Sequence, residues 1–143
     1  MPEPARPVAV VAAGPAARRR VLVVDDNHDA ADSLGVLLGY LGAEACVVHD
    51  GPAALEALAR LRPSLVLLDL GMPGMDGHEV AARMRADPAW DAVRLIALTG
   101  WGQEADRERT RREGFDGHLV KPVDVPALQE LLAEAPALQG GAA

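Results

Sequence analysis

The stretch Leu65-Val66-Leu67-Leu68-Asp69-Leu70-Gly71-Met72-Pro73-Gly74-Met75-Asp76-Gly77 decides the fold class. Its first four residues form a continuous apolar run, which is typical of a strand that is buried on both faces. An acidic residue, Asp69, ends the run, and a loop rich in glycine follows it. A strand without a polar face needs cover on both sides, and this favours a parallel sheet between two layers of helices.

The same alternation of a short apolar run and a helical pattern fills the chain on both sides of this stretch. Further apolar runs occupy residues 21–24, 45–48, 95–98 and 118–120. Between the runs, apolar residues recur at helical spacing, as at Leu34, Leu37, Leu38 and Leu41. Five strands that alternate with five helical segments predict an α/β fold, a doubly wound five-stranded parallel sheet with helices on both faces.

Length and composition narrow the class of protein. The 143 residues allow one compact domain with short tails. We assign residues 20–134 to this domain, residues 1–19 to a flexible leader or linker, and residues 135–143 to a flexible tail. The net charge of −7 argues against a nucleic-acid partner, and a single cysteine, Cys46, excludes a disulfide framework. No apolar run approaches the roughly 18 residues needed to cross a bilayer, so we expect a cytoplasmic protein without membrane contact.

Polar side chains follow the predicted strands at the edge where their carboxyl ends meet. Asp25 and Asp26 end the first strand, Asp69 the third and Thr99 the fourth, and Lys121 follows the fifth. In open α/β sheets the functional crevice lies at this edge. Crowded carboxylates repel one another, and a hard cation such as Mg²⁺, which takes oxygen ligands, relieves the repulsion. The sequence therefore predicts a Mg²⁺ site, with Asp25 and Asp26 as the residues that hold the metal.

A carboxylate beside Mg²⁺, a lysine and a hydroxyl is suited to receive a phosphoryl group. The metal and Lys121 would stabilise the charge on the phosphoryl oxygens during in-line transfer. Asp69 is the candidate nucleophile, forming an acyl phosphate, because it ends the central strand. The loop that follows it contains glycines, which let the backbone approach a ligand.

Four segments, in this order and at fitting distances along the chain, resemble the receiver domain of two-component response regulators. They are Val21-Leu22-Val23-Val24-Asp25-Asp26-Asn27, the run from Leu67 to Gly77, Ala97-Leu98-Thr99-Gly100, and Lys121-Pro122. Each segment alone is a weak signal, whereas the four together are highly specific. The resemblance covers about residues 20–132 and is closest in style to the receivers of hybrid histidine kinases. It implies a flavodoxin-like fold with strand order 2-1-3-4-5.

The resemblance also implies a role for each carboxylate of the site. Asp69 is the phosphoacceptor, and its phosphoryl group comes from a histidine kinase or a histidine phosphotransferase. Asp26, Asp69 and the backbone carbonyl of Gly71 are the expected Mg²⁺ ligands, while Asp25 binds the metal mostly through water. A chain of this kind catalyses only its own phosphorylation and dephosphorylation, so we do not expect an enzyme.

Thr99 and Lys121 complete the site that the resemblance implies. Thr99 swings to hydrogen-bond the phosphoryl group, Lys121 pairs with that group, and the Lys121–Pro122 peptide bond is expected to be cis. Phosphorylation then shifts a conformational equilibrium that already exists in the resting protein.

Two residues depart from the family pattern. His118 stands three residues before the lysine, where the family usually has the Tyr or Phe of its switch, so an aromatic-rotamer switch is in doubt here. Trp101 stands two residues after the threonine, where a bulky ring hinders the approach of water to the acyl phosphate. We expect Trp101→Ala to speed dephosphorylation.

The segment from Gln103 to Glu113 reads as a helix with almost no core, because Ala105 is its only apolar residue. We expect it to be marginal and mobile. The alternatives are a plain solvated helix and part of an output surface, since the family signals to downstream proteins through the face that spans residues 103–134. We expect a monomer or weak dimer, with no DNA-binding or enzymatic output domain in the chain.

Other functions remain as alternatives. A phosphorylation-independent pseudo-receiver would use the same surface only to bind proteins. A phosphohydrolase with an aspartate nucleophile, as in haloacid-dehalogenase-like enzymes, would need a second acid where Asn27 stands. A flavodoxin-like mononucleotide binder would need a hydroxyl- and glycine-rich phosphate loop after the first strand, where this chain has acids. Asp25 and Asp26 could also serve only to cap the helix that follows them.

Overall fold

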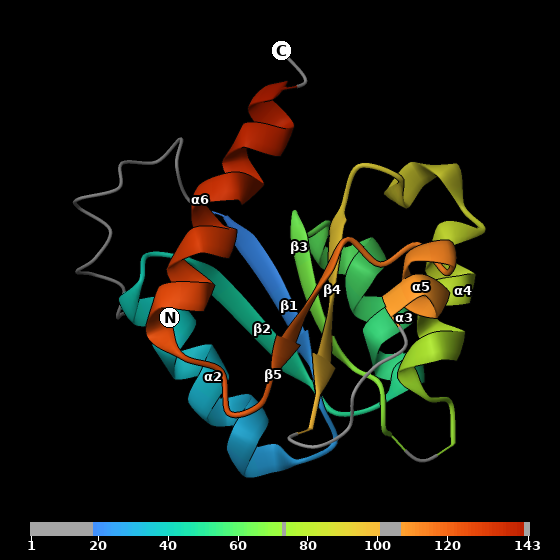
Figure 1. Ribbon diagram of the computed structural model, residues 1–143, viewed down its shortest axis with the longest axis horizontal. Coiled ribbons are helices and arrows are strands. Elements are labelled where there is room, and N and C mark those ends of the chain that lie inside the picture. Colours follow the sequence, from blue (N-terminus) through green and yellow to red (C-terminus); the bar gives the residue numbers. More distant parts are fainter. Residues whose placement is uncertain (1–18, 73, 101–106, 142–143) are drawn as a thin grey trace.

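The computed structural model describes residues 19–72, 74–100 and 107–141. Strands and helices alternate along the chain (Figure 1). The elements are β1 (Arg20–Val24), α2 (His28–Tyr40), β2 (Glu44–Val48), α3 (Gly51–Leu61), β3 (Leu65–Asp69), α4 (Gly77–Arg85), the short 3₁₀ turn η2 (Pro88–Trp90), β4 (Arg94–Thr99), α5 (Arg107–Arg112), β5 (Gly117–Val120) and α6 (Val125–Gly141).

The five strands form one parallel sheet in the order β2-β1-β3-β4-β5. This is the order that the resemblance implied. The central strand is β3, which is buried along its whole length and ends in Asp69. Because all five strands point the same way, their carboxyl ends meet at one edge, which lies at the bottom of Figure 1.

Helices cover both faces of the sheet and give the molecule two apolar cores. In Figure 1, α2 and α6 lie on one side of the sheet, and α3, α4 and α5 lie on the other. Successive residues of β1 alternate between the cores, since Val21 and Val23 pack with α2 and α6 while Leu22 and Val24 pack with α3 and α4. Strands covered on both faces have no polar face, and this explains the continuous apolar runs of the sequence.

Polar capping residues start three of the helices close to the carboxyl edge. Asn27 Oδ1 accepts from the backbone N–H of Ala30, which is the first turn of α2. Asp50 caps α3 and Asp76 caps α4 in the same way. A side-chain oxygen at this position satisfies one of the free N–H groups of a helix terminus. The chain therefore turns sharply after β1, β2 and β3, and the edge stays open to functional side chains.

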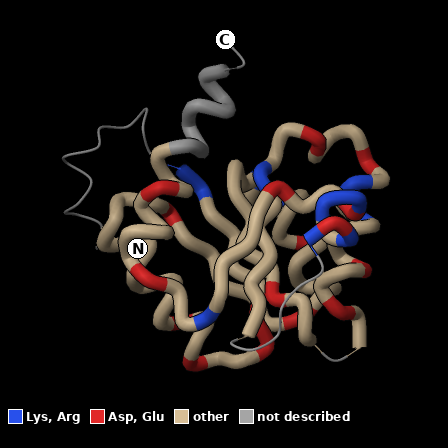
Figure 2. The backbone as a smooth tube through the Cα atoms, in the orientation of Figure 1, with Lys and Arg blue, Asp and Glu red and all other residues tan. Residues whose placement is uncertain are grey.

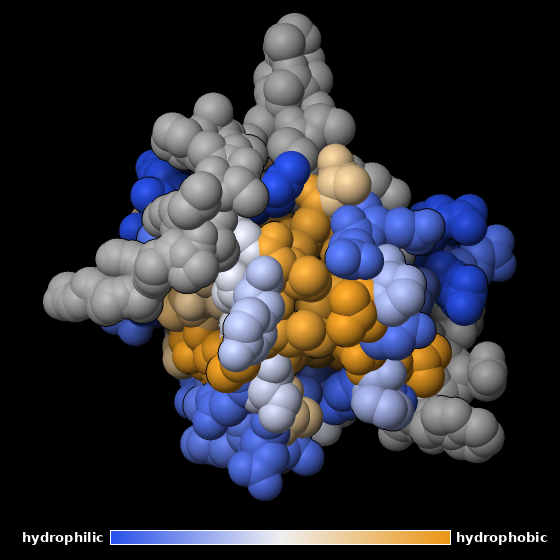
Figure 3. All heavy atoms as spheres, turned by 90° about the vertical axis from the view of Figure 1, so that its left-hand side faces the viewer, coloured by the Kyte–Doolittle hydropathy of each residue, from blue (hydrophilic) through white to orange (hydrophobic). Residues whose placement is uncertain are grey.

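Strand β2 ends the sheet and has only one neighbouring strand among the described residues. Its residues Ala45, Cys46, Val47 and Val48 are consequently half-buried rather than buried. Figure 3 views the molecule from the left-hand side of Figure 1 and shows apolar residues at the surface there, with polar residues around them.

Of the helix predicted over 103–113, residues 107–112 form α5, while 101–106 lie outside the described residues. Two other elements in the second half of the chain differ from the sequence prediction. We did not predict η2, which follows Asp87. The last helix continues to Gly141, through the position of Pro136. Among the residues that the structure describes, no helix is long and apolar enough to span a membrane.

Candidate functional site

Asp25 lies directly after β1 and is almost fully buried, with 1% of its surface exposed. One carboxylate oxygen, Oδ1, accepts from the backbone N–H of Asn27 at 3.0 Å. The other, Oδ2, accepts from Lys121 Nζ at 3.1 Å. A buried carboxylate needs such partners, because burial without them strongly disfavours its charged form. Asp25 therefore does more than cap α2, a task that Asn27 performs.

Asp69 ends β3 and lies beside Asp25. Its Oδ1 accepts from the backbone N–H of Gly71 at 3.1 Å, and its Oδ2 lies 3.6 Å from Lys121 Nζ. Burial raises the pKa of Asp69 to about 6, and the nearby Asp25 also raises it, while the Gly71 N–H and the Lys121 charge lower it. The rise reflects a carboxylate in a partly dry, negatively charged place that one lysine only partly compensates.

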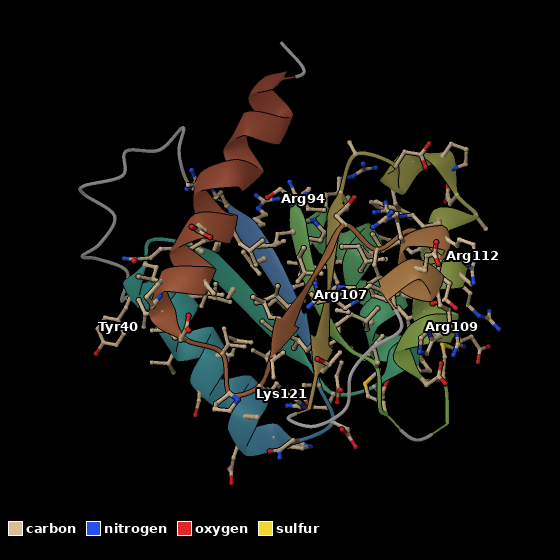
Figure 4. All side chains as sticks on the ribbon, viewed as in Figure 1. Tyr40, Arg94, Arg107, Arg109, Arg112 and Lys121 are labelled. Carbon is tan, nitrogen blue, oxygen red and sulfur yellow. The ribbon has the colours of Figure 1, made fainter. Side chains whose placement is uncertain are left out.

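Lys121 reaches this edge from the end of the last strand. Its backbone N–H donates to Thr99 O at 2.8 Å, which fixes the chain beside the end of β4. The Lys121–Pro122 peptide bond is cis, as the resemblance implied. Figure 4 shows Lys121 at the lower edge of the sheet, where its ammonium group contacts Asp25 and Asp69.

Three carboxylates converge where the sequence placed the metal. Asp25, Asp26 and Asp69 each offer an oxygen, and these oxygens all lie within 4.8 Å of one another. Asp26 is exposed while the other two are buried, so one side of the cluster is open to solvent. Three carboxylates and the ammonium group of Lys121 together carry a net charge of −2. A cluster of oxygen ligands with this net charge fits a hard divalent cation such as Mg²⁺.

Thr99 ends β4 and is buried, beside Val120 of β5 in the sheet register. All five predicted side chains therefore lie at the carboxyl edge, from the ends of β1, β3, β4 and β5. The structure places the backbone of Gly71 beside Asp69 through its N–H group. Trp101, for which we predicted an effect on dephosphorylation, lies outside the described residues.

Gly74, within the loop after Asp69, and Gly77, where α4 begins, are glycines for different structural reasons. Gly74 has a φ of 73°, a left-handed conformation that favours glycine. Gly77 has a different reason, because its backbone passes so close to Asp69 that a Cβ atom would collide with the carbonyl oxygen of Asp69 and would lie 2.8 Å from Leu70 Cα. Gly77 thus lets the start of α4 pack directly against the backbone of the candidate nucleophile.

Two histidines have contacts that the sequence did not predict. The ring of His78 in α4 lies 2.6 Å from Glu113 Oε1, just beyond α5, and meets Phe115 edge to face. His118 Nε2 and the buried hydroxyl of Thr110 lie 2.7 Å apart. Burial lowers the pKa of His118, and the positive charge of Arg107 lowers it further. His118 is therefore a hydrogen-bonded strand residue, and it contacts α5 rather than the carboxylates.

Comparison with protein families gives one assignment for nearly the whole domain. The family model described as the response regulator receiver domain matches residues 21–133. An uncharacterized 14.6 kDa protein of Leptolyngbya boryana is 39% identical over 118 residues, which cover 82% of this chain and 90% of that protein. The DNA-binding response regulator MtrA of Mycobacterium tuberculosis is 40% identical over 105 residues, or 73% of this chain. Those residues are 45% of MtrA, so this chain matches less than half the length of that relative.

Solved structures agree with the family match. A putative response regulator from Chloroflexus aurantiacus superposes with a TM-score of 0.77 and 25% identity, covering 84% of this chain and 98% of that chain. The receiver domain of a sensor histidine kinase from Pseudomonas aeruginosa superposes with a TM-score of 0.74 and 29% identity, covering 83% and 98%. That structure holds a magnesium ion in its active-site cleft.

Proposed function

The chain belongs to the response regulator receiver family of two-component signalling, and from this premise we propose that Asp69 accepts a phosphoryl group and that the resulting change of conformation is the signal. The donor is a histidine kinase or a histidine phosphotransferase. The alternative roles as a phosphohydrolase or a mononucleotide binder have no support from the arrangement of the site.

One observation carries this proposal. Lys121 Nζ lies between two buried carboxylates from different strands, 3.1 Å from Asp25 Oδ2 and 3.6 Å from Asp69 Oδ2. A purely structural lysine gains little by facing two carboxylates that repel each other, because burying the second one costs free energy. The arrangement is instead suited to an anionic group that arrives between Lys121 and Asp69.

Asp25, Asp26 and Asp69 are the side chains that would hold Mg²⁺, together with the backbone carbonyl of Gly71. Their crowding within 4.8 Å, and the raised pKa of Asp69, both fit a site completed by a divalent cation. When bound, Mg²⁺ supplies positive charge that keeps the carboxylates ionised and balances the charge on the phosphoryl oxygens.

The residues of the chain divide the transfer step among them. A carboxylate oxygen of Asp69 attacks the phosphorus atom of a phosphohistidine, a P–O bond forms as the P–N bond breaks, and the imidazole nitrogen leaves with the electron pair. Lys121 is positioned to balance the negative charge on the phosphoryl oxygens. Thr99, at the neighbouring strand end, donates its hydroxyl hydrogen to the phosphoryl group once the transfer is complete.

We further propose that the signal passes to a downstream protein through the face formed by residues 103–134, of which α5, β5 and the first part of α6 are described. Support comes from the contacts of that face, since Thr110 and His118 join α5 to β5. Relatives that are DNA-binding response regulators carry more than this chain matches, so the receiver acts there within a longer protein.

The test is the mass of the intact protein after incubation with acetyl phosphate and Mg²⁺. We expect the mass to rise by one phosphoryl group in the wild-type protein. We expect no rise with Asp69→Asn or with EDTA. Asp76→Asn is the matched control, because Asp76 is a capping carboxylate in the same loop and should not affect phosphorylation.

An unchanged mass would be followed by binding of beryllofluoride, which mimics the phosphoryl group without a donor. Failure of both experiments would contradict the proposal and favour a phosphorylation-independent pseudo-receiver. Phosphorylation that persists in Asp69→Asn would instead place the acceptor elsewhere.

A further inference from the structure

Two histidine rings stack on each other where β1 and β2 end. His28 is the first residue of α2, which follows β1, and His49 comes directly after β2. Their ring centroids lie 3.6 Å apart and their planes differ by 8°. Because β1 and β2 are neighbouring parallel strands, the segments that follow them leave the sheet at the same edge, and this brings the two rings together.

One nitrogen of the His49 ring has no hydrogen-bond partner. Nε2 of His49 is buried and forms no hydrogen bond with any of the described residues. Asp32 Oδ1 lies 3.9 Å from it, which is too far for a hydrogen bond. Buried polar atoms are almost always hydrogen-bonded in folded proteins, and an exception often marks the place of a water molecule or an ion. His49 and Asp32 are therefore candidate ligands of one ion.

Asp32 and His28 lie on the same side of α2. They are four residues apart, which is about one helical turn, so His28, Asp32 and His49 gather at one place. The side chain of Asp32 is 67% exposed and His28 is exposed as well, so solvent reaches the group from outside. We call these three residues the His–Asp cluster. It shares no residue with the carboxylate cluster at the ends of β1 and β3.

The surroundings of the His–Asp cluster are acidic. From Asp25 to Asp50 the sequence has six acidic residues and no Lys or Arg. The single lysine of the chain, Lys121, is paired with Asp25 and Asp69. Figure 2 shows acidic positions at the lower edge, where α2 begins, whereas the arginines of α5 lie on the other side of the domain. The electrostatic potential at the cluster therefore favours a cation over an anion.

The donor atoms of the cluster indicate which cation fits. Imidazole nitrogens and a carboxylate oxygen are ligands that Zn²⁺ and similar transition-metal ions prefer, whereas Mg²⁺ takes oxygen ligands. Two ligand atoms about 2.1 Å from a tetrahedral ion lie roughly 3.4 Å apart. The 3.9 Å between His49 Nε2 and Asp32 Oδ1 is close to this separation, and the exposed side chain of Asp32 can move by the remaining distance.

His28 needs a larger movement to reach the same ion. The two rings are nearly parallel in the stack, so an ion in the plane of one ring lies outside the plane of the other. The exposed His28 ring therefore has to turn out of the stack before it binds the ion. Within the part of the chain that the structure describes, no hydrogen bond holds the His28 ring in the stack.

We infer that the His–Asp cluster binds one Zn²⁺ or a similar transition-metal ion through His28, Asp32 and His49, with water as the remaining ligand. This site is separate from the proposed Mg²⁺ site. It does not depend on the proposed function, because none of its three residues takes part in phosphoryl transfer. A bound ion joins the start of α2 to the end of β2 and so favours the folded state over the unfolded state.

The test is isothermal titration calorimetry of the full chain with ZnCl₂, in an excess of MgCl₂. We expect one Zn²⁺ per chain at this site. His28→Ala and His49→Ala should each weaken binding by at least about tenfold, because each removes a ligand. Asp32→Asn should also weaken binding. The matched control is Asp29→Asn, which removes the same charge from another exposed position of α2 and should change the dissociation constant by less than about twofold.

Further measurements separate this site from the carboxylate cluster. Asp26→Asn with Asp69→Asn should leave the zinc affinity within about threefold. His28→Ala with His49→Ala should still be phosphorylated by acetyl phosphate and Mg²⁺. In NMR spectra of the wild-type protein, one equivalent of Zn²⁺ should shift the ring signals of these two histidines and leave those of the other two unchanged. Zinc should also raise the midpoint of thermal unfolding of the wild type but not of the double histidine variant.

Each contrary result has a distinct meaning. Zinc binding that persists without both histidines, or is lost in the Asp26/Asp69 variant, would place the ion in the carboxylate cluster and overturn the inference. Equal losses in Asp32→Asn and Asp29→Asn would remove Asp32 from the ligands and contradict it as well. A wild type that binds no zinc, yet is phosphorylated on Asp69, would refute the metal site alone and leave the proposed function intact. Circular dichroism on each variant checks that the fold is unchanged.

Discussion

The carboxyl edge of the sheet and helix α5 both carry charged side chains, yet the fold holds them in opposite ways. Asp25 is 1% exposed and is bonded by a backbone N–H and by Lys121. Arg107 and Arg111 are exposed on a six-residue helix that buries only Thr110. The carboxylates proposed to take part in phosphoryl transfer are held at the ends of buried strands, whereas the arginines of α5 lie at the surface.

The physical reason lies in what each region buries. Strands β1, β3 and β4 are covered on both faces, and each fully buried Val or Leu contributes about 1.5–3 kcal/mol to stability. The side chains at the ends of these strands are therefore attached to a well-packed backbone. Helix α5 buries no large apolar side chain of its own, so polar contacts to α4 and β5 hold it.

The sharpest test of a rigid edge is Gly77→Ala. The added Cβ would meet backbone atoms of Asp69 and Leu70, which have no flexible side chain to give way. We expect a loss of about 2–3 kcal/mol in the free energy of unfolding, measured by urea denaturation, together with slower phosphorylation. The matched change is Gly39→Ala in α2, where nothing lies within 4 Å, and there we expect a gain of about 0.5–1 kcal/mol. Equal effects at both positions would show that the edge is not rigid.

The second test concerns the ionisation of Asp69 at the carboxyl edge of the sheet. The pKa of Asp69 is raised to about 6 in the folded protein, so the ionised form is disfavoured by folding and stability falls as the pH rises through that value. In EDTA, Asp69→Asn should therefore stabilise the protein by about 1–2 kcal/mol at pH 8 and by almost nothing near pH 4.

Thermal unfolding across this pH range measures the effect, and Asp26→Asn is the control, because Asp26 is the exposed member of the cluster. A gain in stability that does not depend on pH would contradict the raised pKa of Asp69. A loss at pH 8 would mean that Lys121 more than compensates the burial.

The same contrast explains which features the sequence could predict. The strands could be predicted because burial on both faces leaves continuous apolar runs in β1, β3 and β4, and a polar residue (Asp25, Asp69 or Thr99) then marks the end of each run. Since parallel strands share one carboxyl edge, Asp69 and Lys121 could be expected on the same edge although they are 52 positions apart in the sequence.

Features that depend on how two surface elements pack were not predictable. The contact of His78 with Glu113 joins residues 35 positions apart, and no periodicity fixes which side chains of α4 and α5 meet. The close approach of Gly77 to Asp69 was not predictable either, because the sequence shows the glycine but not the Asp69 backbone that lies against it. The last helix passes the position of Pro136, which pattern alone reads as a stop.

Thr110→Val tests whether polar contacts hold α5 to β5. The substitution keeps the shape of the side chain but removes the hydroxyl that contacts His118 Nε2 and Arg107 O. We expect a loss of about 1 kcal/mol in the free energy of unfolding, with faster amide hydrogen exchange in α5. Val120→Thr on exposed β5 is the comparison and should change stability by less than about 0.5 kcal/mol. No change in exchange would show that apolar packing, and not this hydrogen bond, secures the helix.

The smallest expected effect is that of Glu113→Gln, which removes the charge that neutralises one flank of α5. Because the pKa of Glu113 is lowered in the folded protein, its contribution is present above its ordinary pKa and disappears as the pH falls through the folded value. We expect a loss of only about 0.3–0.5 kcal/mol at pH 7, reduced by salt and absent near pH 3, because the partners are partly exposed. The comparison is Glu79→Gln, which breaks the more exposed pair with Arg83 and should cost less still. Equal losses in the two variants would show that the contacts of Glu113 with His78 and Arg109 stabilise the protein no more than an exposed pair within one helix does.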